Sequence, residues 1–321
     1  MNDLNKLKEK ILEGYQITKE EAIALVKYNQ EDLSYYANEI REKLCGNSFD
    51  MCSIINGKSG ACPENCKYCA QSAHYNTNIE TYQMISKEKA LEEAEENSRE
   101  GVLRYSIVTA GRKLSALERD EVCTLYAHVN EHSNIKLCAS HGLLDYEDLV
   151  ALKKVGVTRY HNNLETSRNY FPQICTTHTY EDKIATIEAA KKAGLSICSG
   201  GIFGLGESIE ERIDMAYDLL ELGVNSIPVN VLVPIEGTPL GTIEPITEEE
   251  VLKTIAIYRF IHPAAAIRLA GGRSNLSEAG KKAFLGGANA AISGNMLTTC
   301  GNTIKEDMKL LEECQFEVKP L

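Results

Sequence analysis

The spacing of apolar residues changes near residue 50, and this change divides the chain into two regions. Before that point the spacing is helical, and Thr18 and Glu21 form a capping box that begins one of the expected helices. After that point short apolar strands alternate with longer helical stretches. The pattern predicts an N-terminal helical extension over residues 1–49 and one larger domain over residues 50–321.

Eight candidate strands follow one another in the second region, with helices between them. The strands are Met51–Asn56, Leu103–Ala110, Ile135–Ser140, Thr158–Glu165, Ser196–Phe203, Ser226–Val233, Ala266–Ala270 and Ala290–Gly294. The clearest helices are Lys87–Glu100, Ala116–Glu131, Tyr180–Ala193 and Glu248–Ile261. Eight strands with crossover helices predict an α/β fold, a (β/α)8 TIM-type barrel, in which reactions occur at the C-terminal ends of the strands. An open doubly wound sheet is the alternative, and the strand count favours the barrel.

Alternation within the strands separates an outer apolar set of residues from an inner polar set. In a barrel the outer set faces the surrounding helices and must be apolar. By this rule the side chains expected to point inward are Lys136, Cys138, Ser140, His161, Asn163, Glu165, Cys198, Asn230 and Arg268. A buried polar group without a partner costs roughly 1–3 kcal/mol. Any one of these residues is equally consistent with a hydrogen-bonded interior group, but five polar strands together predict an interior that holds polar ligands.

Composition limits the partners and the compartment. Of the 321 residues, 43% are hydrophobic and 25% are charged, which is typical of a globular protein. The net charge of −12 argues against nucleic acid and against an anionic membrane, because both need a basic surface. No signal sequence or membrane span is recognisable, so we expect a cytoplasmic protein. Eleven cysteines in that compartment indicate metal or redox chemistry rather than disulfides.

Three of these cysteines lie close together, directly after the first predicted strand. Cys62, Cys66 and Cys69 have the spacing C-x3-C-x2-C on a loop that contains glycine and proline. Thiolates are ligands for iron–sulfur clusters and for zinc. Structural zinc sites usually take four ligands in two pairs, and here the nearest histidine, His74, lies five residues further on. The spacing favours a four-iron cluster with one open iron; zinc and three unligated thiols are the alternatives.

The aromatic residue inside this motif gives the first resemblance to a known family. With Tyr68, the motif reads C-x3-C-x-aromatic-C, and it resembles the signature of the radical S-adenosylmethionine enzymes. In that superfamily the open iron of a [4Fe–4S] cluster binds the amino and carboxylate groups of S-adenosylmethionine. An electron from the cluster then produces a 5′-deoxyadenosyl radical. The motif implies this chemistry but does not identify a substrate.

Further stretches resemble the biotin synthases and together cover most of the chain after residue 50. They are Tyr160–Ser167, Cys198–Glu207, Val229–Val233 with Gly237–Leu240, Arg268–Arg273 and Leu297–Thr299. The resemblance implies a sulfurtransferase that replaces two C–H bonds of dethiobiotin with C–S bonds. It also implies a homodimer, an electron donor such as flavodoxin or ferredoxin, and cluster-assembly proteins. The alternatives are a related enzyme that rearranges an amino acid or matures a metallocofactor, and a zinc-binding protein without turnover.

The resemblance assigns the cofactor site to five residues besides the three cysteines. Tyr68 and Ile202 are expected to line the adenine pocket, and Asn163 and Glu165 to bind the ribose hydroxyls. Glu165 stands where the family usually has aspartate. Lys183 stands where an arginine often pairs with the cofactor carboxylate. Plain core packing for Tyr68 and an exposed helical position for Lys183 are the alternatives.

The substrate site is assigned in the same way. Asn230 is expected to bind the ureido ring of dethiobiotin, and Asn163 to lie between cofactor and substrate. His161 replaces the usual asparagine and is expected to contact the ureido group. Thr298 and Thr299 are expected to meet the substrate carboxylate through backbone N–H groups.

A second, sulfur-donating cluster of the family is matched only in part. Cys138, Cys198 and Arg268 match three of its four ligands, but Ser106 stands where the third cysteine is usual. A serine hydroxyl is a poor iron ligand at neutral pH. We therefore expect Cys175 to complete the site, with either a [2Fe–2S] or a four-iron cluster. The alternative is a [2Fe–2S] cluster with Ser106 or Cys52 as ligand; Cys300 is a further spare thiol.

Overall fold

A barrel of parallel strands forms the centre of the computed structural model, which describes residues 3–299 and 301–321. Within these residues the hydrogen-bonded order is β5-β4-β3-β2-β1-β9-β8-β7-β6, and β10 pairs with the start of β1. The strands are β1 (Ser48–Lys58), β2 (Arg104–Thr109), β3 (Lys136–Ser140), β4 (Val157–His161), β5 (Ser196–Cys198), β6 (Gly201–Phe203), β7 (Ser226–Val231), β8 (Ala266–Leu269), β9 (Ala290–Ile292) and β10 (Glu317–Val318).

The fifth expected strand is divided into two. β5 pairs with β4 and β6 pairs with β7, so the ladders form a partial barrel whose two ends are linked by Ser199 and Gly200. The backbone is too close to β7 here for a side chain, because a Cβ on Gly200 would lie 1.9 Å from the carbonyl oxygen of Pro228. The predicted TIM-type fold is confirmed, with this interruption.

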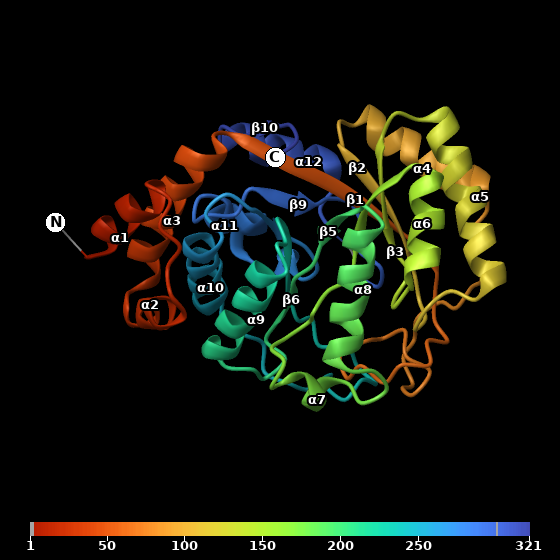
Figure 1. Ribbon diagram of the computed structural model, residues 1–321, viewed down its shortest axis with the longest axis horizontal. Coiled ribbons are helices and arrows are strands. Elements are labelled where there is room, and N and C mark those ends of the chain that lie inside the picture. Colours follow the sequence, from red (N-terminus) through yellow and green to blue (C-terminus); the bar gives the residue numbers. More distant parts are fainter. Residues whose placement is uncertain (1–2, 300) are drawn as a thin grey trace.

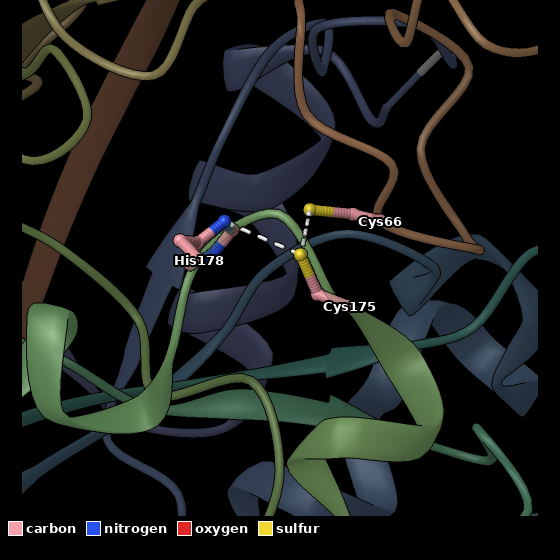
Figure 2. Close-up of side chains that lie close together, drawn as sticks. All are labelled: Cys66, Cys175 and His178. Atoms are coloured by element: carbon pink, nitrogen blue, oxygen red, sulfur yellow. Dashed lines mark hydrogen bonds between the residues drawn. The ribbon is translucent and has the colours of Figure 1, made fainter.

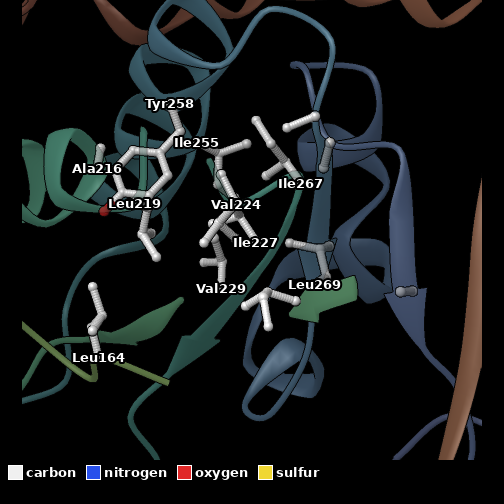
Figure 3. Packing of buried hydrophobic residues seen from close by; sticks show 14 of the residues in the cluster. Leu164, Ala216, Leu219, Val224, Ile227, Val229, Ile255, Tyr258, Ile267 and Leu269 are labelled. Carbon is white, nitrogen blue, oxygen red and sulfur yellow. The ribbon is translucent and has the colours of Figure 1, made fainter. Parts of the chain in front are cut away.

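Helices surround the strands, as Figure 1 shows. The longer ones are α4 (Lys87–Arg99), α5 (Ala116–His132), α6 (Tyr146–Lys154), α8 (Tyr180–Lys192), α9 (Ile209–Glu221) and α10 (Glu248–Ile261). Their apolar faces pack against the outward residues of the strands. Figure 3 shows part of this layer, with Ile227, Val229, Ile267 and Leu269 of the strands facing Ala216, Leu219, Ile255 and Tyr258 of the helices. Burial of each such side chain contributes about 1.5–3 kcal/mol.

The N-terminal helices lie beside the barrel, at the left edge of Figure 1. They are α1 (Asp3–Leu12), α2 (Lys19–Ala24), the 3₁₀ turn η1 (Leu25–Lys27) and α3 (Gln30–Cys45), and α3 packs on α10. The predicted capping box is present, because Thr18 accepts a hydrogen bond from the Glu21 N–H and Glu21 accepts one from the Thr18 N–H. β1 begins close to the expected boundary at residue 50, and the division into two domains stays a prediction.

Shorter elements complete the rims of the barrel. They are α7 (Phe171–Ile174), η2 (Arg273–Asn275), η3 (Ser277–Gly280), α11 (Lys281–Phe284) and α12 (Ile304–Glu313). Among residues 3–299 and 301–321, no helix combines the length and the apolar character that crossing a membrane requires.

Buried charges lie inside the barrel near the N-terminal ends of the strands. Asp50 of β1 is fully buried, and its carboxylate lies 2.7 Å from Arg268, 3.4 Å from Arg104 and 3.8 Å from Arg159. Burial by itself raises the pKa of Asp50, but Arg268 and Arg159 outweigh it and lower the pKa to about 2. Lys136, which we expected inside, is instead the exposed first residue of β3.

We expect Asp50→Asn to lower the free energy of unfolding by about 3–5 kcal/mol, because it leaves buried arginines without their counter-charge. Urea unfolding of the anaerobically purified protein measures the change. Asp120→Asn is the matched control, since Asp120 pairs with Arg119 on the surface and its loss costs about 1 kcal/mol or less. Equal losses in the two variants would contradict the role of Asp50. The stabilisation by Asp50 is present above about pH 4 and is lost as the pH falls toward 2.

Candidate active site

The three motif cysteines lie on the loop that leaves the C-terminal end of β1. The loop is folded on itself, because the Ala73 N–H donates to Cys62 O at 2.8 Å and the Cys69 N–H donates to Cys66 O at 3.0 Å. Cys62 is buried, and the other two are half-buried. Burial raises the pKa of Cys62, and it raises the pKa of Cys69 to about 11. Three thiols in a water-poor loop fit an iron–sulfur cluster, whose positive irons stabilise the thiolate form.

A cavity of about 320 Å³ opens at the C-terminal ends of the strands, next to this loop. All of the predicted cofactor- and substrate-binding residues except Lys183 line it. These are Tyr68, His161, Asn163, Glu165, Ile202, Asn230, Thr298 and Thr299, and Cys69 lines the same cavity. The structure therefore brings both predicted binding sets together beside the cysteine motif.

Among the residues predicted to bind the cofactor, one carboxylate oxygen is left free. Glu165 follows β4 with a φ of 73°, and within the described residues its buried Oε2 has no hydrogen-bond partner. Lys183 lies 3.7 Å from the other oxygen of Glu165 and is only 7% exposed, so the exposed-lysine alternative is wrong. Burial and the nearby Glu165 raise the pKa of Tyr68. A buried carboxylate with a free oxygen fits a ligand that carries hydroxyl donors, such as a ribose.

Among the residues predicted to bind the substrate, two amides are held by backbone hydrogen bonds. Asn230 donates to the Gly201 carbonyl at 3.0 Å and accepts from the Gly271 N–H at 2.9 Å. Asn163 Oδ1 accepts from the Gly200 N–H at 3.1 Å and lies 2.8 Å from His161 Nε2. Burial lowers the pKa of His161, so the ring is neutral near pH 7. The backbone of β6 and of the loop after β8 thus fixes the polar groups that face the cavity.

A second group of thiols lies deeper in the barrel. Cys52 Sγ accepts a hydrogen bond from Arg268 at 3.2 Å and interacts electrostatically with Cys138 and Cys198. Burial raises the pKa of Cys52 to about 12. Ser106 is the register partner of Cys138 on the neighbouring strand. Within the described residues the buried Oγ of Ser106 and the Nε of Arg268 have no partners, which fits a site for an anionic group.

Cys175 does not join these thiols, and the expectation that it does is wrong. Figure 2 shows its sulfur pointing toward Cys66, 3.7 Å away, with His178 Nδ1 at 3.2 Å. The reason is that Asn65 of the cysteine loop accepts a hydrogen bond from the Thr176 N–H, which ties this segment to the rim. The shared hydrogen bond raises the pKa of Cys66 and lowers that of Cys175.

The sequence reasoning named Cys52 only as an alternative ligand, and it missed His178. Alternation in β1 turns Met51 and Ile55 outward and therefore Cys52 inward, so the same rule identifies Cys52 when it is applied to this strand. His178 has only the spacing of its C-x2-H sequence as a signal, which is weak alone. Cys300 lies outside the described residues.

Comparisons with known proteins agree with this geometry. Residues 58–219 match the model of the radical SAM superfamily, and residues 228–317 match that of the biotin and thiamin synthesis associated domain. The biotin synthase of Clostridium botulinum (strain Hall) is 57% identical over 99% of this chain and 100% of its own length. The biotin synthase of Brachyspira hyodysenteriae is 55% identical over 98% of this chain and 95% of its own length.

Two solved structures share the fold at low sequence identity. Methylornithine synthase matches with a TM-score of 0.84 at 20% identity, covering 98% of this chain and 97% of its own. A maturase of the [FeFe]-hydrogenase matches with a TM-score of 0.83 at 18% sequence identity. The match covers 98% of this chain and 74% of that protein. At such identity these likenesses concern the fold alone, whereas the full-length relatives and the two matched models identify the family. The chain therefore belongs to the biotin synthases, within the radical S-adenosylmethionine superfamily.

Proposed function

We propose that this chain converts dethiobiotin to biotin by inserting one sulfur atom at two unactivated C–H positions. The observation that carries the proposal is that both predicted binding sets and Cys69 of the cysteine motif line one and the same cavity. The half-buried thiol of Cys52 and the buried thiols of Cys138 and Cys198 add a second candidate metal centre in the same barrel. An amino-acid rearrangement needs no such second centre.

The first centre is proposed to be a [4Fe–4S] cluster held by Cys62, Cys66 and Cys69. When bound with S-adenosylmethionine, it supplies the 5′-deoxyadenosyl radical that removes hydrogen from the substrate. The free oxygen of Glu165 is suited to accept a hydrogen bond from a ribose hydroxyl. The positive charge of Lys183 offsets the charge of the same carboxylate. Tyr68, Ile202 and Asn163 complete this side of the cavity. The protein's part is to orient the reactants and to exclude water.

The substrate side is proposed to hold dethiobiotin through amide hydrogen bonds. Asn230 and Asn163 are fixed by backbone groups, so little side-chain entropy is lost when they bind a ureido ring. His161 is neutral and close enough to Asn163 to share the same ligand. Thr298 and Thr299 line the same cavity, and their backbone N–H groups suit a carboxylate.

The sulfur source is proposed to be a second iron–sulfur cluster on Cys52, Cys138 and Cys198, next to Arg268. Three thiolates leave one ligand position to Arg268 or to an exchangeable sulfide, as on a four-iron cluster. The arginines near these thiols suit the negative charge of such a group. Cys52 replaces Cys175 in this proposal because of its contact with Arg268.

The remaining partners are proposed on the family alone. They are an electron donor such as flavodoxin or ferredoxin, cluster-assembly proteins, and a second copy of the chain in a homodimer. A cytoplasmic location agrees with the ten cysteines among the described residues, all of which are free thiols.

We expect Cys62→Ala, Cys66→Ala and Cys69→Ala each to abolish 5′-deoxyadenosine formation, because each removes one ligand of the proposed cluster. The product is measured by chromatography after anaerobic reduction with S-adenosylmethionine. Cys123→Ala, in the outer helix α5, is the matched control and should keep the parental rate. Any motif variant that also keeps it would refute the ligand assignment.

Asn230→Ala should weaken dethiobiotin binding about tenfold, because a buried hydrogen-bond partner of the ligand is lost. Binding of S-adenosylmethionine should change much less, and calorimetric titration compares the two. Asn275→Ala is the control, since Asn275 is exposed outside the cavity. Equal loss of affinity for both ligands in Asn230→Ala would exclude a substrate-specific role.

Cys52→Ser should lose the second cluster, whereas Cys175→Ser should retain it. Iron and sulfide analysis with Mössbauer spectroscopy on anaerobic protein separates the two centres. The reason is that Cys52, and not Cys175, lies with Cys138 and Cys198. The reverse outcome, loss in Cys175→Ser alone, would restore the expectation drawn from the sequence.

A further inference from the structure

Cys66, Cys175 and His178 form a compact group that the proposed function does not use as a unit. Within residues 3–299 and 301–321 it is the only set of three metal-binding side chains whose ligand atoms all lie within 4.8 Å of one another. Figure 2 shows the two sulfurs and the imidazole converging on one point from two segments. Cys175 and His178 are buried, and Cys66 is half-buried.

The separations match those of ligands on one tetrahedral ion. A zinc–sulfur bond of about 2.3 Å places two thiolates roughly 3.8 Å apart along the edge of the tetrahedron. The two sulfurs lie 3.7 Å apart, and Cys175 Sγ lies 3.2 Å from His178 Nδ1. Cys62 and Cys69 are outside this compact group, as expected if each thiolate of the motif binds a different iron of a cluster.

A neighbouring carboxylate and balancing cations are also present. The carboxylate of Glu64 contacts His178 Nδ1 but is not part of the group whose ligand atoms all lie within 4.8 Å, so it is a neighbouring anion and not a fourth ligand. Arg112 lies 3.6 Å from the other oxygen of Glu64, and Lys183 interacts electrostatically with Cys66. These cations offset the excess negative charge of two thiolates and a carboxylate around a divalent ion.

The two segments are held in this arrangement by the backbone. The Asn65 N–H donates to Thr177 Oγ1 at 3.1 Å, and the Lys67 N–H donates to Ile174 O at 3.0 Å. Cys175 follows directly after α7, and its N–H donates to the carbonyl oxygen of Phe171, the first residue of that helix. The donors therefore need little rearrangement to meet one ion, and a preorganised set binds more tightly.

We propose that the cluster-free chain binds one thiophilic divalent ion of the zinc type through Cys66, Cys175 and His178. Two thiolates and an imidazole suit Zn²⁺, with a water molecule in the fourth position of the tetrahedron. Since Cys66 is also a proposed ligand of the radical cluster, the ion and that cluster exclude each other. Only this last consequence rests on the proposed function.

Cobalt is the spectroscopic probe for this site, because tetrahedral Co²⁺ with thiolate ligands has visible and charge-transfer bands. The test uses reduced, cluster-free protein carrying Cys62→Ser and Cys69→Ser, which removes the three-thiol site of the motif and keeps all three proposed ligands. Adding Cys175→Ser to this background should remove one equivalent of bound Co²⁺ and its bands. Adding Cys314→Ser, which changes a thiol at the end of α12, should remove none. Equal Co²⁺ binding with and without Cys175 would overturn the proposal.

Alkylation of the wild-type chain gives a second measurement that needs no folded variant. Peptide mass spectrometry compares the labelling of each cysteine with and without Zn²⁺. Loss of labelling at Cys66 and Cys175, with Cys62 and Cys69 unchanged, is the expected result. Protection of Cys62, Cys66 and Cys69 with Cys175 still labelled would overturn it. Neither experiment requires turnover. If the enzymatic assignment is wrong, both experiments still decide whether this metal site exists.

Discussion

The buried carboxylate of Asp50 is the group that allows this barrel to have a polar interior. It faces Arg268, Arg104 and Arg159, which come from three other strands, and its charge compensates theirs where water is excluded. Without an anion at this position, the buried Arg268 and the half-buried Arg104 and Arg159 would lack a counter-charge. Arg268 also donates a hydrogen bond to Cys52. The ion pairs of Asp50 are therefore connected to the thiol group inside the barrel.

A different constraint shapes the C-terminal rim. The cysteine loop and the segment around Cys175 are bonded to each other through Asn65, and residues 68–71 of that loop line the cavity. Asn163 is fixed by the backbone of Gly200, and Asn230 by the backbone of β6 and of the loop after β8. The cavity is therefore bounded by groups whose positions are set before any ligand binds, which favours a reaction that must exclude water and stray donors.

Much of this arrangement could be predicted because strand periodicity and barrel topology are simple rules. The helix Glu248–Ile261 was predicted with the bounds that it has, and the alternation in the later strands identified Asn230, Cys198 and Arg268 as inward residues. The divided fifth strand was not foreseen, because it follows from the close approach of Gly200 to Pro228, a contact between residues far apart in the chain. Lys136 was misjudged because alternation says nothing about where along a strand the interior begins.

The sequence by itself determined the class of chemistry and the order of the elements. The spacing of Cys62, Cys66 and Cys69 is local, so three thiols on one loop follow from it directly, and the alternation of strands and helices restricts the fold to few topologies. The tertiary structure alone decided which of the other thiols meet. Cys52 reaches Arg268 because β1 and β8 face one interior, and Cys175 reaches Cys66 because two rim loops converge. Such pairings depend on contacts between residues more than one hundred positions apart, and no local pattern in the chain encodes them.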